Sequence, residues 1–383
     1  MRIGINALHL TEGGGGAVRY AGELLRAICE NAHGLDITVF VSREAPEDIV
    51  NAVWASAVRF VTVPVPAQGR STALVQVGGL LPYALRHRVQ VLHSLAGVGP
   101  PRVPGAMASV VTLLDVIWLL LPDQVSMTAA QRATWIRFSR LATGTATRVI
   151  AISEAGARDI SKAYDIPRAK IDVTPLGVRT VALAEPTPEP ELRARLGLGD
   201  GRILLSIGQQ QPYKAQDQLI RALAALDEEE HGDVVLALPG PPTAYGAELE
   251  RLAAELGVAD RVALLGFVAD EDVEGLFVVA TGVVQPSRME GFGLPALEAL
   301  HRGRPLATSG HSALGEVVGD AALRFDPDDV GSVTGALRRL LDDEALRDDL
   351  AVRGPLRAAT FTWEATAAAT LESYRRALHR GRS

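Results

Sequence analysis

The sequence predicts an α/β protein built from two doubly wound domains, and three observations carry that prediction. The chain has 383 residues, more than one hydrophobic core usually supports. Short β-branched segments alternate with longer segments of helical spacing along both halves, which is typical of βαβ units and parallel sheets. A proline-rich stretch at 184–190 separates the halves, because proline cannot continue a helix or a central strand. We therefore expect domains at 1–180 and 181–361.

Strands and helices are expected to alternate in the same way in both halves. In the first half the strands are expected at residues 2–7, 37–42, 58–64, 89–93, 109–113, 148–153 and 171–175. In the second half they are expected at residues 202–207, 234–238, 261–265, 282–285, 305–308 and 322–325. Helical spacing marks 17–32, 129–143, 273–280 and 363–378. The last segment carries alanine and leucine on one face, so we expect 362–383 to return as a helix that docks on the N-terminal domain.

The composition indicates a soluble globular protein of the cytoplasm. Hydrophobic residues make up 48% and charged residues 22%, and the formal charge of −7 argues against binding to nucleic acid. Cys29 is the single cysteine, so no intramolecular disulfide is expected. The amino terminus lacks the pattern of a signal peptide, and the most apolar stretch, 116–121, is too short to span a membrane. Peripheral contact with a membrane stays open.

The segment 286–300 carries the strongest local signal for a ligand site. A predicted strand leads into a turn with Gly291 and Gly293, and a helix is expected from about Leu294. Glycines let the backbone approach a ligand, and the start of a helix directs free N–H groups toward an anion such as a phosphate. Glu290 precedes the helix and Glu298 lies about one turn into it. For Glu298 the alternative is an exposed helix charge.

This segment resembles the Glu-x7-Glu motif of the retaining family 4 glycosyltransferases, whose usual form Glu-Gly-Phe-Gly-Leu-Pro stands at 290–295. Residues 208–214 resemble the loop after the first C-domain strand of that family. Ser153-Glu154, 175–178 and 361–364 are similar to further landmarks, whereas 41–88 resembles it only weakly. The resemblance implies the GT-B architecture, in which two Rossmann-like domains face a cleft, with ligands at the carboxyl ends of the strands.

The resemblance also implies individual roles and a metal-independent transfer with retention of configuration. The donor would be a UDP-, GDP- or dTDP-sugar, and the acceptor a small molecule or a glycan. Lys214 and Glu290 would be catalytic: Lys214 would neutralise the diphosphate, Glu290 would hold the sugar, and Glu298 the ribose. The donor site would comprise Gly15, Gly208, Gln209, Lys214, Val268, Glu290, Gly291, Phe292, Gly293, Leu294 and Glu298. The acceptor site would comprise Gly14, Gly16, His93, Leu114 and Asp115.

Each of these residues also has a plainer interpretation. Lys214 is one of only three lysines, yet a lysine on a strand-to-helix loop is often a surface residue. Val268 reads equally as the end of a core strand, and the glycine run 13–16 as a flexible loop. His93 is either a ligand-contacting residue or a satisfied histidine at a strand end. The apolar region near Trp118 is either an acceptor surface or a buried helix.

Two positions depart from the family pattern. Gln209 stands where the family usually has an arginine, and we expect Arg288 or Arg19 to substitute for that cation. Leu114 aligns with a histidine that reaches the donor sugar. We interpret this replacement as the mark of a pentose or deoxysugar donor, because a leucine would leave a hydroxymethyl group unpaired. The alternative is that Leu114 is a core residue.

Other chemistries find less support. The run Asp270-Glu271-Asp272 has carboxylate spacing of the kind that holds a cation, but it opens a helical segment, where acidic residues are expected to cap free N–H groups. We therefore predict no metal site. The rival function is a non-catalytic sugar or nucleotide-sugar binding protein, and another GT-B enzyme such as an epimerase or phosphorylase is the third reading. The acceptor is expected to be a natural product, and a glycan of the cell envelope is the alternative.

Overall fold

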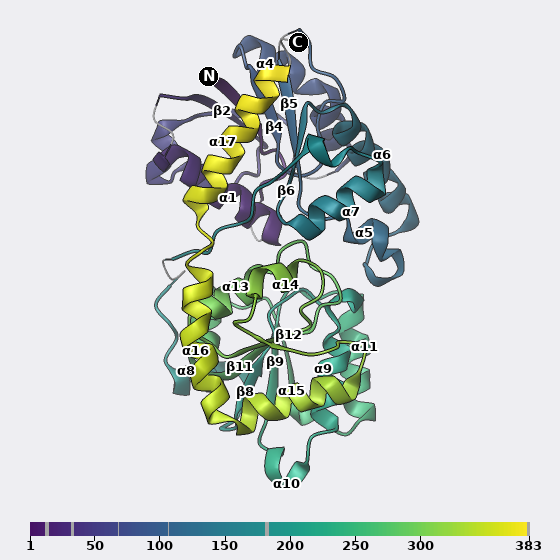
Figure 1. Ribbon diagram of the computed structural model, residues 1–383, viewed down its shortest axis with the longest axis vertical. Coiled ribbons are helices and arrows are strands. Elements are labelled where there is room, and N and C mark those ends of the chain that lie inside the picture. The colour runs from purple at the N-terminus through teal and green to yellow at the C-terminus, as the bar shows by residue number, and fades with distance from the viewer. Residues whose placement is uncertain (12–14, 32–33, 68, 106, 181–183, 381–383) are drawn as a thin grey trace. The chain divides into compact units, whose positions relative to one another are not determined.

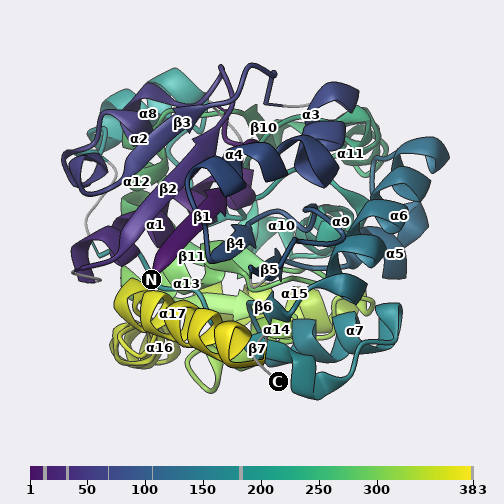
Figure 2. The same cartoon turned by 90° about the horizontal axis from the view of Figure 1, so that it is seen from above.

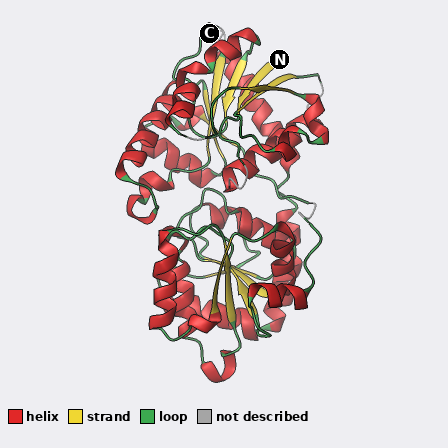
Figure 3. Cartoon of the chain, turned by 180° about the vertical axis from the view of Figure 1, so that it is seen from behind, coloured by secondary structure: helices red, strands yellow, loops and turns green. Residues whose placement is uncertain are grey.

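The computed structural model describes residues 1–11, 15–31, 34–67, 69–105, 107–180 and 184–380 (Figure 1). The chain divides into two compact units. The first comprises residues 1–120, 127–177 and 362–383, and the second comprises residues 121–126 and 178–361. Each unit consists of a central parallel sheet with helices on both faces (Figure 3).

Within its described residues the first unit contains a seven-stranded parallel sheet of order β3-β2-β1-β4-β5-β6-β7. The strands are β1 (Arg2–Asn6), β2 (Asp36–Val41), β3 (Arg59–Thr62), β4 (Val91–Ser94), β5 (Ala108–Leu113), β6 (Arg148–Ala151) and β7 (Ile171–Val173). The main helices are α1 (Gly15–Asn31), α2 (Glu47–Val50), α3 (Arg70–Leu74), α4 (Leu81–Arg86), α5 (Ile117–Leu120), α6 (Ala129–Thr145), α7 (Glu154–Tyr164) and α17 (Trp363–Arg380). A π-helical turn, η2 (Val75–Gly79), joins α3 to α4, and η1 (Val53–Ala57) and η4 (Arg168–Lys170) are 3-10 turns.

In the part of the second unit that the structure describes, six parallel strands take the order β10-β9-β8-β11-β12-β13. They are β8 (Ile203–Leu205), β9 (Val235–Pro239), β10 (Val262–Gly266), β11 (Ala280–Gln285), β12 (Leu306–Thr308) and β13 (Leu323–Arg324). The helices are α8 (Glu189–Leu196), α9 (Gln216–Ala224), α10 (Glu228–His231), α11 (Ala244–Glu255), α12 (Asp270–Val279), α13 (Leu294–His301), α14 (Ala313–Val318), α15 (Val330–Asp342) and α16 (Glu344–Ala358). The 3-10 turns are η3 (Pro122–Gln124), η5 (Pro212–Lys214) and η6 (Ala259–Arg261).

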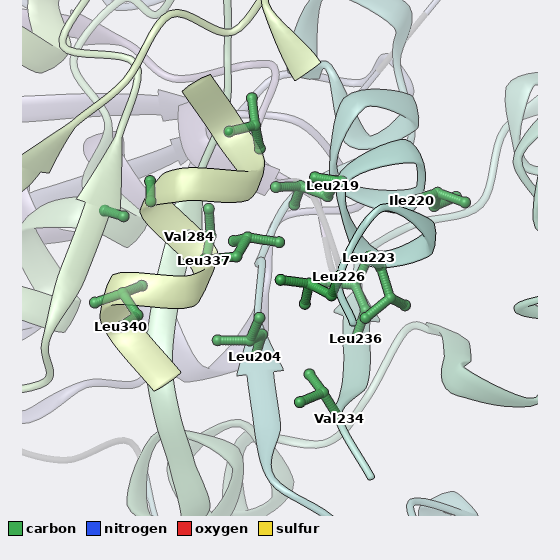
Figure 4. Close-up of a cluster of buried hydrophobic side chains, with 14 of the residues drawn as sticks. Leu204, Leu219, Ile220, Leu223, Leu226, Val234, Leu236, Val284, Leu337 and Leu340 are labelled. Atoms are coloured by element: carbon green, nitrogen blue, oxygen red, sulfur yellow. The ribbon is translucent and has the colours of Figure 1, made fainter. Parts of the chain in front are cut away.

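The core of the second unit lies between its sheet and the helices α9 and α15. Leu204 of β8 and Leu219 and Leu223 of α9 are fully or almost fully buried, and Leu337 and Leu340 of α15 close the cluster (Figure 4). The apolar side chains of each helix lie on one face, and this face packs against the sheet, as expected for an amphipathic helix. This packing fixes the loops that leave the strands.

The C-terminal helix α17 packs on the first unit, as the sequence predicted. It lies beside α1 (Figure 2) and also contacts β5 and β6. Asp172 of β7 accepts hydrogen bonds from Ser373 at 2.7 Å and Arg376 at 3.0 Å, and it also pairs with the buried Arg148. A buried carboxylate needs such partners because its desolvation is costly. The ion pair therefore anchors α17 to the sheet.

Candidate active site

The order of the second sheet reverses between β8 and β11. From β8 the chain proceeds outward to β9 and β10, and from β11 it proceeds the other way to β12 and β13. In open parallel sheets a ligand binds outside the carboxyl ends of the strands at such a reversal. The two loops that begin there are 206–214, after β8, and 286–293, after β11. These loops carry Lys214 and Glu290.

Lys214 and Glu290 form an ion pair across these loops. Nζ of Lys214 lies 2.6 Å from Oε1 of Glu290, and their side chains are only 13% and 11% exposed. Lys214 ends the 3-10 turn η5, and its ammonium lies 5.3 Å from the centre of the Tyr213 ring. Two largely buried opposite charges stabilise each other where an isolated charge would be costly. The lysine is therefore held at the glycine-containing turn rather than on an open surface.

Three serine hydroxyls fix the Glu290 loop. Oγ of Ser287 donates to Oε1 of Glu290 at 2.7 Å, and Oγ of Ser312 donates to the carbonyl oxygen of Glu290 at 3.1 Å. Oγ of Ser309 donates to the carbonyl of Ser287 at 2.7 Å. Ser312 adopts φ 54°, a conformation that costs strain in a residue with a Cβ. Sequence reasoning missed these residues, although the position of Ser287 three residues before Glu290 could have indicated its contact.

Arg288 organises the lysine turn. Its backbone N–H donates to the carbonyl of Tyr213 at 2.8 Å, and Nη1 donates to the carbonyl of Pro212 at 2.9 Å. Its Nε also pairs with Asp328 at 2.6 Å. These contacts hold η5 in place. They use two of the five N–H donors of the guanidinium, so the expectation that Arg288 replaces a missing phosphate-binding cation stays a prediction.

The start of α13 has the geometry of an anion-binding turn. Gly293 takes φ 97°, and a Cβ at this position would lie 2.5 Å from Cδ2 of Leu314, so only glycine fits. Pro295 occupies the first turn of the helix, and no side chain caps its N-terminus. The adjacent Phe292 is buried, with its ring 5.7 Å from that of Phe361. The N–H groups at the start of α13 are thus rigidly placed.

The remaining predicted donor residues of the second unit differ in their exposure. Glu298 is 5% exposed, so it is not the exposed helix charge of the alternative interpretation. Gly208 lies against Lys214, since a Cβ there would be 3.8 Å from Cδ of the lysine. Gln209 is exposed, and Val268 is half-buried beside the 73% exposed Phe267. Gly291 is buried and Leu294 half-buried within the turn.

The two glutamines that follow Gln209 form hydrogen bonds that hold the loop in place. Gln210 and Gln211 are 3% and 5% exposed. Oε1 of Gln211 accepts a hydrogen bond of 2.8 Å from the backbone N–H of Ser126, and the carbonyl of Gln210 accepts one from Thr243. Short polar links of this kind hold the segment 206–214 against its neighbours. This loop geometry could not be read from the Gln-Gln-Gln run in the sequence.

In the first unit His93 belongs to the core. It is fully buried, with Nδ1 2.7 Å from the Tyr374 hydroxyl and Nε2 2.7 Å from Oγ1 of Thr112, which also lies 3.0 Å from the Tyr20 hydroxyl. Burial lowers the pKa of His93 to about 3. The side chain offers no surface to an acceptor, so the structure favours the satisfied strand-end histidine. Sequence pattern alone did not distinguish the two.

The other predicted site residues of the first unit follow strands of its sheet. Gly15, predicted for the donor and with φ 52°, and Gly16, predicted for the acceptor, open α1 and are exposed, whereas Gly14 lies outside the described residues. Leu114 and Asp115 follow β5 and are half-buried, and Oδ1 of Asp115 accepts a hydrogen bond from the N–H of Ile117 at 3.0 Å. In α5, Trp118 packs against the core cluster, which favours the buried-helix interpretation.

The acidic run at the start of α12 has a structural role that differs from the expected one. The N-cap position is Ala269, and no side chain caps the helix. Asp272 is 4% exposed, pairs with Arg195 and accepts a hydrogen bond from Thr187 at 2.8 Å. The predicted capping is therefore wrong, because Asp272 turns to an ion pair instead. Among the described residues no three His, Cys, Asp or Glu side chains gather in a way that could hold a metal ion.

Two family models and several known proteins match the chain. Residues 15–177 match the glycosyl transferase 4-like domain, and residues 188–357 match the glycosyl transferases group 1. A D-inositol 3-phosphate glycosyltransferase of Frankia alni is 36% identical over 242 residues, 61% of this chain and 59% of the relative. An MMP alpha-(1->4)-mannosyltransferase of Mycolicibacterium hassiacum is 34% identical over 239 residues, 61% and 54% of the two chains. The chain thus spans less than two thirds of the length of these relatives.

Solved structures share the fold over almost the whole chain. Sucrose-phosphate synthase from Thermosynechococcus elongatus superposes with a TM-score of 0.76 at 23% identity, covering 99% of this chain and 100% of that one. Anabaena HepE in complex with UDP and glucose superposes with a TM-score of 0.73 at 20% identity, covering 97% and 98%. At these identities the likeness concerns the architecture of two parallel-sheet domains.

Proposed function

We propose that the chain is a glycosyltransferase of the GT-B fold, because a glycosyltransferase model matches each half of it, and that it moves a sugar from a nucleoside diphosphate sugar to a hydroxyl acceptor with retention of configuration. The single observation that carries the proposal is the Lys214–Glu290 pair, with Nζ and Oε1 2.6 Å apart at the reversal of strand order. A cation, a carboxylate and the uncapped start of α13 meet there, which suits a sugar linked to a diphosphate.

The proposed chemistry rests on charge that develops as the diphosphate leaves. Lys214 would bind the diphosphate, and N–H groups at the start of α13, which has no side-chain cap, would add further donors. An ammonium carries three N–H donors, so contact with a phosphate is compatible with the bond to Glu290. Groups fixed in advance stabilise the developing charge more than the ground state, and that difference lowers the barrier.

Retention is proposed from the family resemblance. In such a reaction the acceptor oxygen bonds to the anomeric carbon on the face from which the diphosphate departs, and the departing phosphate takes the acceptor proton. Glu290 would hold the sugar hydroxyls through its carboxylate, which Ser287 keeps in place. Glu298 would accept hydrogen bonds from the ribose. The sugar would then be oriented without a side chain that attacks it.

For the acceptor and for the nucleotide base of the donor, we propose classes of molecule. The curated relatives are named for inositol 3-phosphate and for a mannosyl transfer, which supports testing phosphorylated polyols as acceptors. The bound UDP of the Anabaena structure supports testing UDP-sugars first, with GDP- and dTDP-sugars beside them. The proposed acceptor is a natural product, with cell-envelope glycans as the alternative.

Thermal shift and donor hydrolysis test the proposal. We expect UDP, GDP or dTDP to raise the melting temperature while free glucose or mannose does not, because a ligand that binds only the folded state stabilises it by mass action. Cleavage of the matching nucleotide sugar should follow, and Lys214→Ala should lose both effects. Lys162→Ala, at an exposed lysine of α7, is the control. Stabilisation by free sugars alone would instead indicate a sugar-binding protein.

A further inference from the structure

The first unit contains a long segment without negative charge. Residues 51–114 contain no Asp or Glu but five arginines, although the whole chain has 45 acidic residues and a formal charge of −7. Arg59, Arg86, Arg88 and Arg102 are exposed. A segment of this kind is a local source of positive potential on a protein that is otherwise acidic. Its partner should therefore carry negative charge.

Part of this segment exposes an apolar helical face. The helix α3, the π-helical turn η2 and α4 follow one another without a break in helical backbone from Arg70 to Arg86. Leu74 is 66% exposed and Leu85 53% exposed, and the exposed Gly78 and Pro82 lie between them in the sequence. Figure 2 shows α3 and α4 in succession along the outside of this unit.

The opposite face of the same segment is buried in the core of the first unit. Leu80 and Ala84 are buried, and they pack in a cluster with Phe40, Val89 and Leu92. A surface helix normally covers its outer face with polar side chains. Here both faces are apolar, and the residue that follows Leu85 on the exposed side is Arg86. Apolar side chains bordered by arginine are typical of helices that lie in the interface of a membrane.

We propose that the α3–η2–α4 face docks on a bilayer that contains anionic lipid, with Leu74 and Leu85 entering the interface and Arg86 contacting headgroups. Burying two exposed leucines supplies the apolar gain, and the segment 51–114 that carries this face contributes no carboxylate to repel anionic lipid. A symmetric pair of chains joined through this face is disfavoured, because an isologous interface would place like-charged arginines together. The proposal rests on the first unit alone and does not depend on the proposed function.

Vesicle sedimentation of the full chain tests the proposal. The chain should bind vesicles of mixed phosphatidylcholine and phosphatidylglycerol, bind pure phosphatidylcholine far less, and release as salt rises. Leu74→Ser with Leu85→Ser should weaken binding at least about tenfold, and Arg86→Glu about fivefold or more. The matched controls are Val352→Ser with Leu356→Ser, which are 66% and 70% exposed on α16, and Arg251→Glu on α11. Melting temperatures establish that each variant is folded.

Several outcomes would overturn the proposal. They are no vesicle binding by the folded chain, equal binding to neutral and anionic vesicles, and unchanged binding by the leucine variant. Retention on RNA or heparin in the absence of vesicle binding would assign the arginines to a soluble polyanion. Sedimentation velocity of the leucine variant would detect a dimer lost with this face, which would also contradict a lipid partner.

Discussion

Nζ of Lys214 lies 2.6 Å from Oε1 of Glu290. The two residues lie on the loops that follow the neighbouring strands β8 and β11. The same carboxylate oxygen accepts a hydrogen bond from Ser287. Neither charge has to move far to meet a ligand, because the loops already place both at the carboxyl edge of the sheet.

Removal of the lysine charge should abolish most transfer. Lys214→Gln is expected to lower kcat for donor cleavage by about 10²–10³, because a fixed cation stabilises the leaving diphosphate mainly in the transition state. Steady-state kinetics with the donor found by thermal shift measures the effect. Lys162→Gln should behave as wild type, and a Lys214→Gln enzyme within about twofold of wild type would refute the assignment.

Loss of Arg288 should act through the lysine turn. Arg288→Ala removes the bond from Nη1 to the Pro212 carbonyl and the ion pair with Asp328, so Lys214 is held less well and kcat should fall about ten- to a hundredfold with a smaller change in KM. Arg288→Lys should recover part of the loss. The decisive measurement is the double variant Lys214→Gln with Arg288→Ala, which should be no slower than Lys214→Gln. Additive losses would mean that Arg288 acts independently.

The backbone at Gly293 should tolerate no side chain. In Gly293→Ala the new Cβ would meet Cδ2 of Leu314 at 2.5 Å in a left-handed conformation, so we expect a lower melting temperature and weaker nucleotide binding. Gly335→Ala in α15 is the matched control, because nothing lies within 4 Å of its added Cβ. That variant should gain about 0.5–1 kcal/mol of stability. Equal effects of the two substitutions would contradict the assigned geometry.

Acid should destabilise the first unit through His93. Burial lowers its pKa from 6.5 to about 3, so below pH 6.5 the unfolded chain binds more protons than the folded chain. The free energy of unfolding should therefore fall as the pH drops from 6.5 toward 3, by up to about 1.4 kcal/mol per pH unit from this group. His93→Gln should be less stable at pH 7 but should show a shallower dependence on pH.

Chemical unfolding between pH 7 and pH 4.5 measures that slope. Burial also lowers the pKa of His9, to about 4, so the variant isolates the share of His93. His379→Gln, at an exposed residue of α17, should keep the wild-type slope. An unchanged slope in His93→Gln would show that other groups control the acid sensitivity.

Leu114 should influence the choice of donor sugar. If the leucine lies beside the position of the hydroxymethyl group, a hexose donor loses a hydrogen bond worth roughly 1–3 kcal/mol. Leu114→His should then shift the ratio of kcat/KM toward glucose-type over xylose-type donors by about tenfold or more. Competition between the two donors measures this ratio directly. An unchanged preference would contradict the role of Leu114 in the choice of donor sugar.

The sequence by itself predicted the architecture well. The alternation of short β-branched runs with helical spacing indicated strands close to each observed one, because side-chain period reports local structure. Gly293 could likewise be singled out, since a turn followed by a helix needs a residue free of Cβ strain. The resemblance to the Glu-x7-Glu motif family singled out Lys214 and Glu290.

Only the tertiary structure decided which side chains meet. Ser309 and Ser312 reach the Glu290 loop from the strand-to-helix connection after β12, and Arg288 meets the carbonyl of Pro212 seventy-six positions earlier in the chain. His93 became a core residue because Tyr374 returns from the far end of the sequence to contact it. Contacts of this range depend on strand order and helix packing, and no local pattern encodes them.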